Sequence, residues 1–351
     1  MRIATRADNP FERFALTAGQ VPTPLFDTYV AFFTARAVMA GASLGIFAAL
    51  AERPDDAAGL ASRLDLDPPG VEVLVTALHA LGYLEAADGG RYAVTSATRK
   101  WLLDESTSVA AFATVFDYDM WDHIGRMEDG IRSGQPIGLH ERPADDPYWE
   151  RYMRGLFEIS RLASDIAARL IGARNPRSAL DLAGGHGEYS MALCRRHEGL
   201  TATIVDLEGA ARIGRRIVEE QGMADRVTYR VGDLFEADLG TGHDIAMANS
   251  ITHHFDEERN VAMLRRARDA LRPGGTMAVL DLERAEPGKR GTQIGTLTGL
   301  LFYVTSHART YSGRELEGFL QSAGFERVRS RRHARLPGTV LVLGRAPSSS
   351  D

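Results

Sequence analysis

Between about Leu25 and Leu103, apolar residues recur at the three- and four-residue spacing of helices. A proline-proline-glycine break at 68–70 interrupts this pattern, and the stretch after it carries an apolar stripe of Val71, Leu74, Leu78 and Leu81. The segment GYLEAADGGRYAVT (82–95) then has the pattern of two strands joined by a glycine turn. Helix, turn, helix and hairpin in this order predict a winged-helix arrangement.

The segment 31–51 (AFFTARAVMAGASLGIFAALA) is apolar on all sides, with Arg36 as its only charge, and a membrane span is one interpretation of it. We reject that interpretation because alanine and glycine dominate and the uncharged part after Arg36 is shorter than the ~20 apolar residues that a span needs. A helix of this kind is normally buried, so we expect it to pack in a core or against a second subunit.

After residue 104 the pattern of apolar and polar positions changes. Residues 104–170 have the pattern of connecting helices around a Pro-, Gly- and Asp-rich loop at 133–147, and from Arg177 onward short strands alternate with helices. That alternation predicts an α/β fold, with a mostly parallel sheet covered by helices on both faces. We expect these domains: a winged helix at 1–104, connecting helices at 105–170, an α/β domain at 171–346 and a disordered tail at 347–351.

Composition and charge disfavour several classes of partner. A formal net charge of -6 and a pI of about 6.0 are unfavourable for a nucleic-acid or membrane-surface binder. The second helix of the winged-helix segment, which would have to enter the DNA major groove, contains no Lys or Arg. Cys194 is the only cysteine and the N-terminus lacks a signal-peptide pattern, so we expect a cytoplasmic protein. The scattered histidines predict no metal site.

The stretch ALDLAGGHGEYS (179–190) contains the strongest candidate for a binding site. A strand-like run ends in a turn built on Gly184, Gly185 and Gly187, and a helix follows. Such a turn lets a ligand approach the main chain closely, and the helix offers free N–H groups. By itself the pattern fits NAD, FAD, a nucleoside without phosphates, or a simple tight turn.

Three carboxylates narrow these alternatives. Asp206 ends the following strand, where it can accept hydrogen bonds from both ribose hydroxyls. Asp233 follows the next strand, where it can bind an adenine amine while Leu234 covers the ring. Asp181 stands directly before the glycines, where it would repel a pyrophosphate and attract an ammonium group. The predicted ligand is a nucleoside with a cationic, amino-acid-like tail.

With these features in place, the chain resembles class I S-adenosylmethionine (SAM)-dependent methyltransferases. The segments DLAGGHGEYS, VDLEGA, GDLF and ANSITHHFDEE follow in the family's order, and the winged helix makes the whole similar to plant caffeate-type and bacterial secondary-metabolite O-methyltransferases. Ala183 departs from the pattern, because the family usually has glycine there. The resemblance implies a Rossmann-like domain, a homodimer, and SAM contacts from Asp181, Gly184, Gly185, Gly187, Asp206, Leu207, Asp233, Leu234 and Asn249.

The resemblance also implies a general base. It assigns that role to His253, which follows the strand 243–250, and places Asp281 where the family has a glutamate that orients the base. His254 stands where relatives often carry aspartate, and Thr310 stands where a second acid is expected. A neutral imidazole suits the task because it can take the proton of a phenol as attack begins.

A flat, largely apolar acceptor is expected from the aromatic residues of the connecting helices and the late loop, which suggests an aromatic or polyketide-like small molecule. The candidates for lining the acceptor pocket are Phe116, Tyr118, Trp121, Tyr152, Met153, Phe157, Leu301, Phe302 and Tyr303. Other interpretations stay open: methylation of carbon or nitrogen, or a SAM-binding protein without methyl transfer. A nicotinamide dehydrogenase is disfavoured by Asp181 and by Ser190, which stands where the dinucleotide fingerprint has its third glycine.

Overall fold

The computed structural model describes residues 4–115, 120–136, 138, 140–286 and 292–348. These residues form two compact units, one up to residue 115 and one from Met120 onward. The segment 105–170, which we expected as a separate connecting region, is therefore divided between the two units. Phe116 and Tyr118 lie outside the described residues.

The N-terminal unit contains the predicted helix, turn, helix and hairpin. Its hairpin pairs β1 with β2, with Leu84 opposite Val94, and a core forms around Ile46, Leu60 and Leu78. Aspartates cap two helices: Asp56 accepts the Gly59 N–H and Asp67 the Gly70 N–H. The elements are α1 (Pro10–Thr17), α2 (Thr23–Leu25), the π-helix η1 (Phe26–Val30), α3 (Ala31–Ser43), α4 (Ile46–Glu52), α5 (Ala57–Leu64), α6 (Pro68–Ala80), β1 (Leu84–Ala87), β2 (Arg91–Val94), α7 (Ser96–Leu102) and α8 (Ala110–Val115).

The apolar segment 31–51 is only partly buried within this unit. Ile46, Phe47 and Leu50 of α4 are buried, whereas Phe32 and Phe33 at the start of α3 are 51% and 55% exposed. Burial in the chain's own core is thus found for α4 and not for the first turns of α3, where burial against a second subunit stays a prediction. Among the described residues, no single helix is long and apolar enough to cross a membrane, and the pair Thr23–Ser43 and Ile46–Glu52 meets that test only with a bend of 57°.

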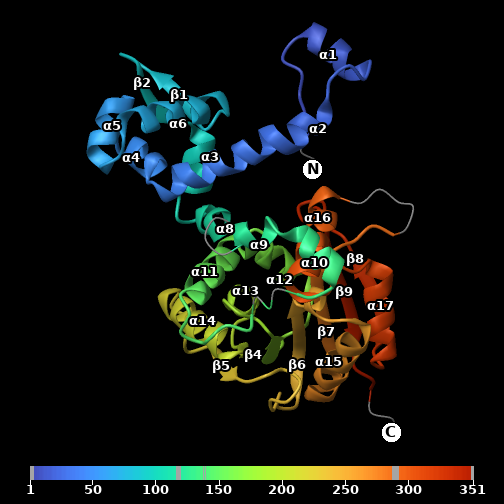
Figure 1. The fold of residues 1–351 in the computed structure, drawn as a ribbon. Coiled ribbons are helices and arrows are strands. Elements are labelled where there is room, and N and C mark those ends of the chain that lie inside the picture. The colour runs from blue at the N-terminus through green and yellow to red at the C-terminus, as the bar shows by residue number, and fades with distance from the viewer. Residues whose placement is uncertain (1–3, 116–119, 137, 139, 287–291, 349–351) are drawn as a thin grey trace. The chain divides into compact units, whose positions relative to one another are not determined.

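The second unit is built on a seven-stranded sheet in the order β5-β4-β3-β6-β7-β9-β8 (Figure 1). The first five strands in this order are parallel, and β9 runs antiparallel to both β7 and β8. The predicted mostly parallel α/β sheet is therefore confirmed. The strands are β3 (Ser178–Leu182), β4 (Thr201–Asp206), β5 (Val227–Val231), β6 (His243–Asn249), β7 (Leu271–Leu282), β8 (Glu326–Arg331) and β9 (Thr339–Arg345).

Helices flank this sheet in two groups, since α12 packs against α13 and α15 packs against α17. Buried Leu, Val, Ala and Met side chains of β3, β6 and β7 form the core between the sheet and its helices. The helices are α9 (Trp121–Ile124), α10 (Met127–Ser133), α11 (Tyr148–Ser160), α12 (Ser164–Ile171), α13 (Glu188–Arg196), α14 (Glu208–Glu220), the 3₁₀-helix η3 (Thr252–His254), α15 (Glu257–Ala270), α16 (Gln293–Ser306) and α17 (Gly313–Ser322).

Polar residues interrupt the apolar pattern where the parallel strands end. Asp181 of β3, Asn249 of β6 and Asp281 of β7 are 0%, 7% and 2% exposed. The register pairs Asp181 with Met247 and Asn249 with Leu280, so these residues lie at the same edge of the sheet. Because buried polar groups are costly unless they are partnered, this edge is where a ligand is expected.

Candidate functional site

The turn after β3 has the tight geometry predicted from its glycines. Gly185 and Gly187 have φ values of +48° and +78°, a region that favours glycine. A side chain at Gly184 would come within 2.6 Å of the Asp181 carboxylate, and one at Gly187 within 2.8 Å of the Tyr229 hydroxyl. Ala183 also has a positive φ, +52°, which costs an L-residue about 1–2 kcal/mol. The departure at Ala183 is thus accommodated, at a cost in backbone strain.

Asp206 ties the end of β4 to this turn. Its Oδ2 accepts the Gly185 N–H at 2.7 Å and its Oδ1 accepts the Leu207 N–H at 2.7 Å. Burial raises the pKa of Asp206 to about 6, although the two N–H donors oppose that shift. Each carboxylate oxygen retains a second lone pair, so Asp206 still has acceptor capacity for two ligand hydroxyls.

Asp181 and Asn249 carry buried polar atoms without a protein partner. The Ser190 hydroxyl donates to Asp181 Oδ2 at 2.7 Å, but Asp181 Oδ1 and the Asn249 side-chain nitrogen have no hydrogen-bond partner among the described residues. Burial raises the pKa of Asp181 to about 7. Because unpartnered buried polar groups are rare, the acceptor at Asp181 and the donor at Asn249 are suited to a ligand that carries both an ammonium and a carboxylate group.

The two residues predicted for an adenine ring lie differently from each other. Asp233 is exposed, and its Oδ1 accepts the Phe235 N–H at 2.8 Å, so its second oxygen is available to a ligand. Leu234 is 8% exposed and belongs to the main core, while Leu207, at the end of β4, is 43% exposed. A ring at this edge would therefore meet more apolar surface at Leu207 than at Leu234.

The predicted pairing of His253 with Asp281 is present. His253 Nδ1 lies 2.6 Å from Asp281 Oδ1, and both side chains are buried. The other oxygen of Asp281 accepts the hydroxyl of Thr252 at 2.5 Å and its N–H at 3.1 Å. Burial opposes ionisation of Asp281, yet His253 and these hydrogen bonds hold its pKa below the ordinary value.

This arrangement fixes which nitrogen of His253 is reactive. An ionised Asp281 accepts the proton on Nδ1, which leaves the lone pair on Nε2. No hydrogen bond to Nε2 is present among the described residues. Phe302 stacks on the ring at a centroid distance of 3.5 Å and an interplanar angle of 3°. His253 is thus oriented on one side, covered on one face, and able to accept a proton at Nε2.

Two further histidines stand beside His253. The His254 ring centroid lies 4.5 Å from that of His253, and the His140 centroid lies 4.9 Å from that of His254. His140 comes from the loop before α11 and contacts Trp149 and Tyr152. Sequence reasoning missed His140, because its sequence neighbourhood indicates only a loop and the path of that loop brings it to the site.

Among the described residues predicted for the acceptor pocket, Phe302 is in direct contact with His253. Met153 lies against the glycine turn, 3.2 Å from where a Gly185 side chain would start, and Phe157 packs on His186 within that turn. Burial and nearby Asp206 raise the pKa of Tyr152. Met153 and Phe157 therefore face the turn after β3, whereas Tyr152 of the same helix contacts His140 and so lies beside the cluster of His254 and His253.

The remaining predictions have varied outcomes. Tyr303 contacts His307 with a centroid distance of 5.2 Å, and Leu301 and Trp121 are half-buried. Thr310 is buried and donates to the Gly295 carbonyl at 3.3 Å, so it does not replace the missing acid beside His253. Within the described part of the chain, no group of three or more His, Cys, Asp or Glu side chains could hold a metal ion.

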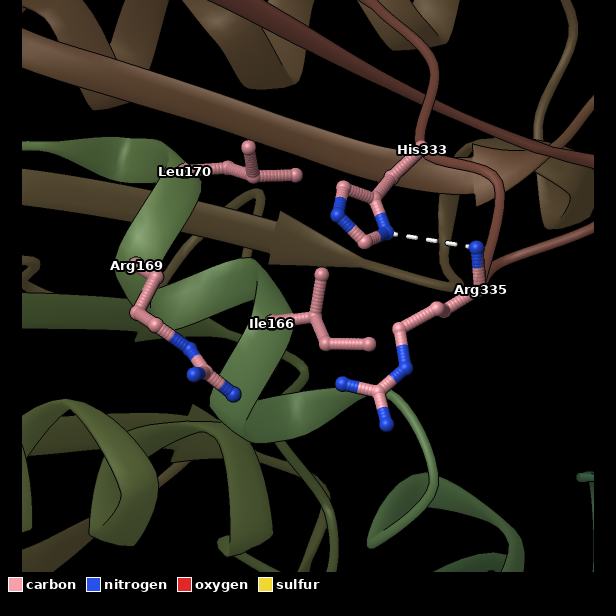
Figure 2. Close-up of a pocket in the computed structure, with 5 residues that line it drawn as sticks. All are labelled: Ile166, Arg169, Leu170, His333 and Arg335. Atoms are coloured by element: carbon pink, nitrogen blue, oxygen red, sulfur yellow. Dashed lines mark hydrogen bonds between the residues drawn. The ribbon is translucent and has the colours of Figure 1, made fainter.

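A partly open cavity lies outside this constellation. It has a volume of about 180 Å³ and is lined by Ile166, Arg169, Leu170, His333 and Arg335 (Figure 2). Figure 2 shows the side chains of His333 and Arg335 at this cavity. The backbone N–H of Arg335 donates to His333 Nδ1 at 3.2 Å. None of the residues predicted from the sequence for the functional site lines this cavity.

Comparisons with known proteins bear on the whole chain. Residues 133–326 match the family model of the O-methyltransferase domain. The 3-hydroxy-5-methyl-1-naphthoate 3-O-methyltransferase of Streptomyces sahachiroi is 29% identical over 340 residues, which cover 92% of this chain and 95% of that relative. The tetracenomycin polyketide synthesis 8-O-methyl transferase of Streptomyces glaucescens is 27% identical, covering 93% and 97%. The structure of human N-acetylserotonin methyltransferase in complex with SAM has a TM-score of 0.82 at 19% identity, covering 98% of this chain and 100% of that one.

Proposed function

Because the chain belongs to the O-methyltransferase family, we propose that it transfers a methyl group from SAM to a hydroxyl group of an aromatic or polyketide-like small molecule, with His253 as general base. The observation that carries this proposal is the buried His253–Asp281 pair at the sheet edge that also holds the glycine turn. The acceptor class rests on relatives named for a hydroxynaphthoate and for the polyketide tetracenomycin.

The residues at the sheet edge fit SAM. Asp206 would hold the ribose hydroxyls, and the unpartnered atoms of Asp181 and Asn249 would hold the amino-acid end. The turn of Gly184, Gly185 and Gly187 keeps side chains away from the ligand. When bound, SAM supplies an electrophilic methyl group on a positively charged sulfur.

Residues of the chain accept the proton that the substrate hydroxyl group loses. As the acceptor oxygen gains the methyl group, its proton passes to His253 Nε2, and Asp281 stabilises the resulting imidazolium through Nδ1–H. A positioned base of this kind contributes on the order of 10²–10⁴-fold, or about 3–5 kcal/mol. Alignment of the two reactants contributes more, on the order of 7–11 kcal/mol. Phe302, stacked on His253, holds the ring in the orientation that this transfer needs.

The test uses labelled methyl donor, a panel of hydroxylated naphthalenes and anthraquinones, and calorimetric titration with S-adenosylhomocysteine (SAH). We expect His253→Ala to lower kcat by about 10²–10⁴-fold and to leave SAH affinity unchanged. Asp206→Ala should abolish SAH binding, while Glu257→Gln, a change on the exposed start of α15, should alter neither. Full turnover in His253→Ala would refute the base assignment, and a folded protein that does not bind SAH would refute the proposed function.

We also propose a cytoplasmic homodimer, formed through the N-terminal unit. This unit exposes Phe11, Phe14, Tyr29, Phe32 and Phe33, and the last three contact one another as a cluster. Exposed apolar groups of this size are costly in water unless a partner covers them. Sedimentation should give a dimer for the native chain and a monomer for Phe32→Asp, with Val73→Asp on α6 as the charge control. A native monomer would contradict the proposal.

A further inference from the structure

Beside the proposed base, the site presents a second imidazole whose hydrogen bonding can be worked out. His254 Nδ1 lies 2.9 Å from the Ser306 hydroxyl on α16. The Ser306 hydroxyl is 3.5 Å from Thr305 Oγ1, and the Thr305 hydroxyl itself donates to the Leu301 carbonyl at 3.0 Å. Ser306 has one proton to donate, and its shorter contact is with the histidine. This contact allows either atom to be the donor, and when Ser306 donates to Nδ1 the proton of a neutral His254 ring lies on Nε2.

The neighbours of His254 keep this ring neutral. Burial, and then nearby His253 and His140, lower the pKa of His254 well below 6.5. Burial, with His253 and Arg142, lowers the pKa of His140 to about 4. A neutral ring with Nδ1 occupied by Ser306 has one remaining polar function, an N–H donor directed away from α16. Next to the proton acceptor at His253 there is consequently a proton donor.

We propose that His254 recognises a carbonyl oxygen next to the hydroxyl group that is methylated, and that the enzyme therefore selects hydroxyarenes with a carbonyl group in the ortho or peri position. This inference rests on the proposed function and narrows its substrate class. The juxtaposition that supports it is a donor and an acceptor on adjacent rings, 4.5 Å apart between centroids. His140 also contacts His254, at a centroid distance of 4.9 Å, and stacks on Trp149.

An N–H donor at His254 can release the hydroxyl group of such a substrate from its internal hydrogen bond. In an ortho- or peri-hydroxy carbonyl compound, the hydroxyl proton is held in an internal hydrogen bond to the carbonyl oxygen. When the His254 N–H donates to that carbonyl oxygen, the internal bond can be given up without leaving the oxygen unpartnered. The hydroxyl proton is then free to turn to His253 Nε2, where it goes as the oxygen gains the methyl group. The His254 proton stays on its nitrogen throughout.

Two isomeric dihydroxyanthraquinones provide a direct test. In anthrarufin each hydroxyl lies peri to a carbonyl, whereas in anthraflavic acid the hydroxyls lie far from the carbonyls, and the two have the same size and composition. Binding of each is measured by fluorescence titration on the full chain saturated with SAH. We expect anthrarufin to bind roughly ten- to hundredfold more tightly, the effect of one well-placed hydrogen bond. Equal affinities, preference for anthraflavic acid, or failure of both to bind would overturn the proposal.

Three variants at one position separate recognition from structural damage. His254→Gln retains an N–H donor near the position of Nε2 and should keep the preference for anthrarufin. His254→Leu removes the donor and His254→Asp replaces it with an acceptor, and both should lose the preference while anthraflavic acid binds as before. His333→Gln, at a histidine outside the site, is the matched control. If His254→Leu retained the preference, the donor would not be the cause, and saturable SAH binding in every variant would show that the proposed function still stands.

Discussion

Asp181→Asn is expected to stabilise the ligand-free protein at neutral pH, although it removes a residue that the proposed cofactor needs. Asp181 is 0% exposed, and one of its two oxygens has no partner among the described residues. Burial raises its pKa from the ordinary value of 3.8 to about 7, against the opposing hydrogen bond from Ser190. Asparagine has nearly the same shape as aspartate but no charge. The variant therefore avoids the free-energy cost of burying a carboxylate charge at neutral pH.

The sign and size of the effect follow from proton linkage. A carboxyl group with a raised pKa binds its proton more tightly in the folded chain, so folding stability falls as the pH rises from about 4 to about 7. A pKa that changes from 3.8 to about 7 corresponds to about 4 kcal/mol, a cost fully present above pH 7 and absent below pH 4. Between pH 5 and pH 8 the stability advantage of Asp181→Asn should therefore grow by about 3 kcal/mol.

Urea unfolding of the ligand-free native chain and of Asp181→Asn, compared at each pH from 5 to 8, measures this difference. Titrating groups that do not interact with Asp181 are common to both proteins and cancel in the comparison, whereas Asp206, whose charge helps to raise the pKa of Asp181, contributes to the difference. Asp238→Asn is the control for removing a carboxylate that is not buried, because the Asp238 side chain is 82% exposed and pairs with Arg230 at the surface. A constant difference for Asp181→Asn, or one that shrinks as the pH rises, would refute the reasoning that Asp181 is an unpaired buried carboxylate.

Other expected outcomes can be checked with the same material. SAH affinity should fall about tenfold per pH unit below pH 7, because the ligand ammonium needs an ionised Asp181; calorimetry that gives a flat profile would contradict this. Gly187→Ala should cost at least about 2 kcal/mol in urea unfolding, since φ is +78° and the new methyl would lie 2.8 Å from Tyr229, whereas Ala183→Gly should be tolerated. Thr252→Val should cost about 1 kcal/mol and lower kcat by loosening the aspartate that pairs with His253; unchanged values would show that its hydroxyl has no role.

The parts of the fold and site that local sequence determines were predictable. The hairpin at 84–94 follows from a glycine turn between alternating strands, and the turn after β3 from three glycines that must adopt positive φ or lie against Asp181. Asp206 could be placed because carboxyl ends of parallel strands meet at one edge, whereas Asp281 was placed by a family resemblance. The pairing of His253 with Asp281 was implied by a family resemblance and not by spacing along the chain.

What sequence could not give depends on tertiary packing. His140 reaches the site through the path of an irregular loop, which no periodicity encodes. Tyr152, Met153 and Phe157 have the helical spacing of α11, but packing decides that Met153 and Phe157 meet the turn after β3 while Tyr152 meets His140. The exposed start of α3 could not be foreseen either, because an apolar helix has the same pattern whether its own chain or a partner covers it.

The three strand-end aspartates explain how one sheet edge can both bind a ligand and run acid–base chemistry. Burial raises the pKa of Asp181 and Asp206, which pair with no cation in the part of the chain that the structure describes. Asp281 instead has a lowered pKa because His253 and the Thr252 hydroxyl stabilise its charge. The surroundings thus divide three carboxylates of the same type. Asp181 and Asp206 keep acceptor oxygens for a ligand, whereas the hydrogen bonds of Asp281 come from the protein itself. Under the proposed function, Asp181 binds a cation, Asp206 binds hydroxyl groups and Asp281 orients the base. The different roles proposed for the three aspartates therefore follow from which of them has hydrogen-bond partners in the protein and which keeps an oxygen free for a ligand.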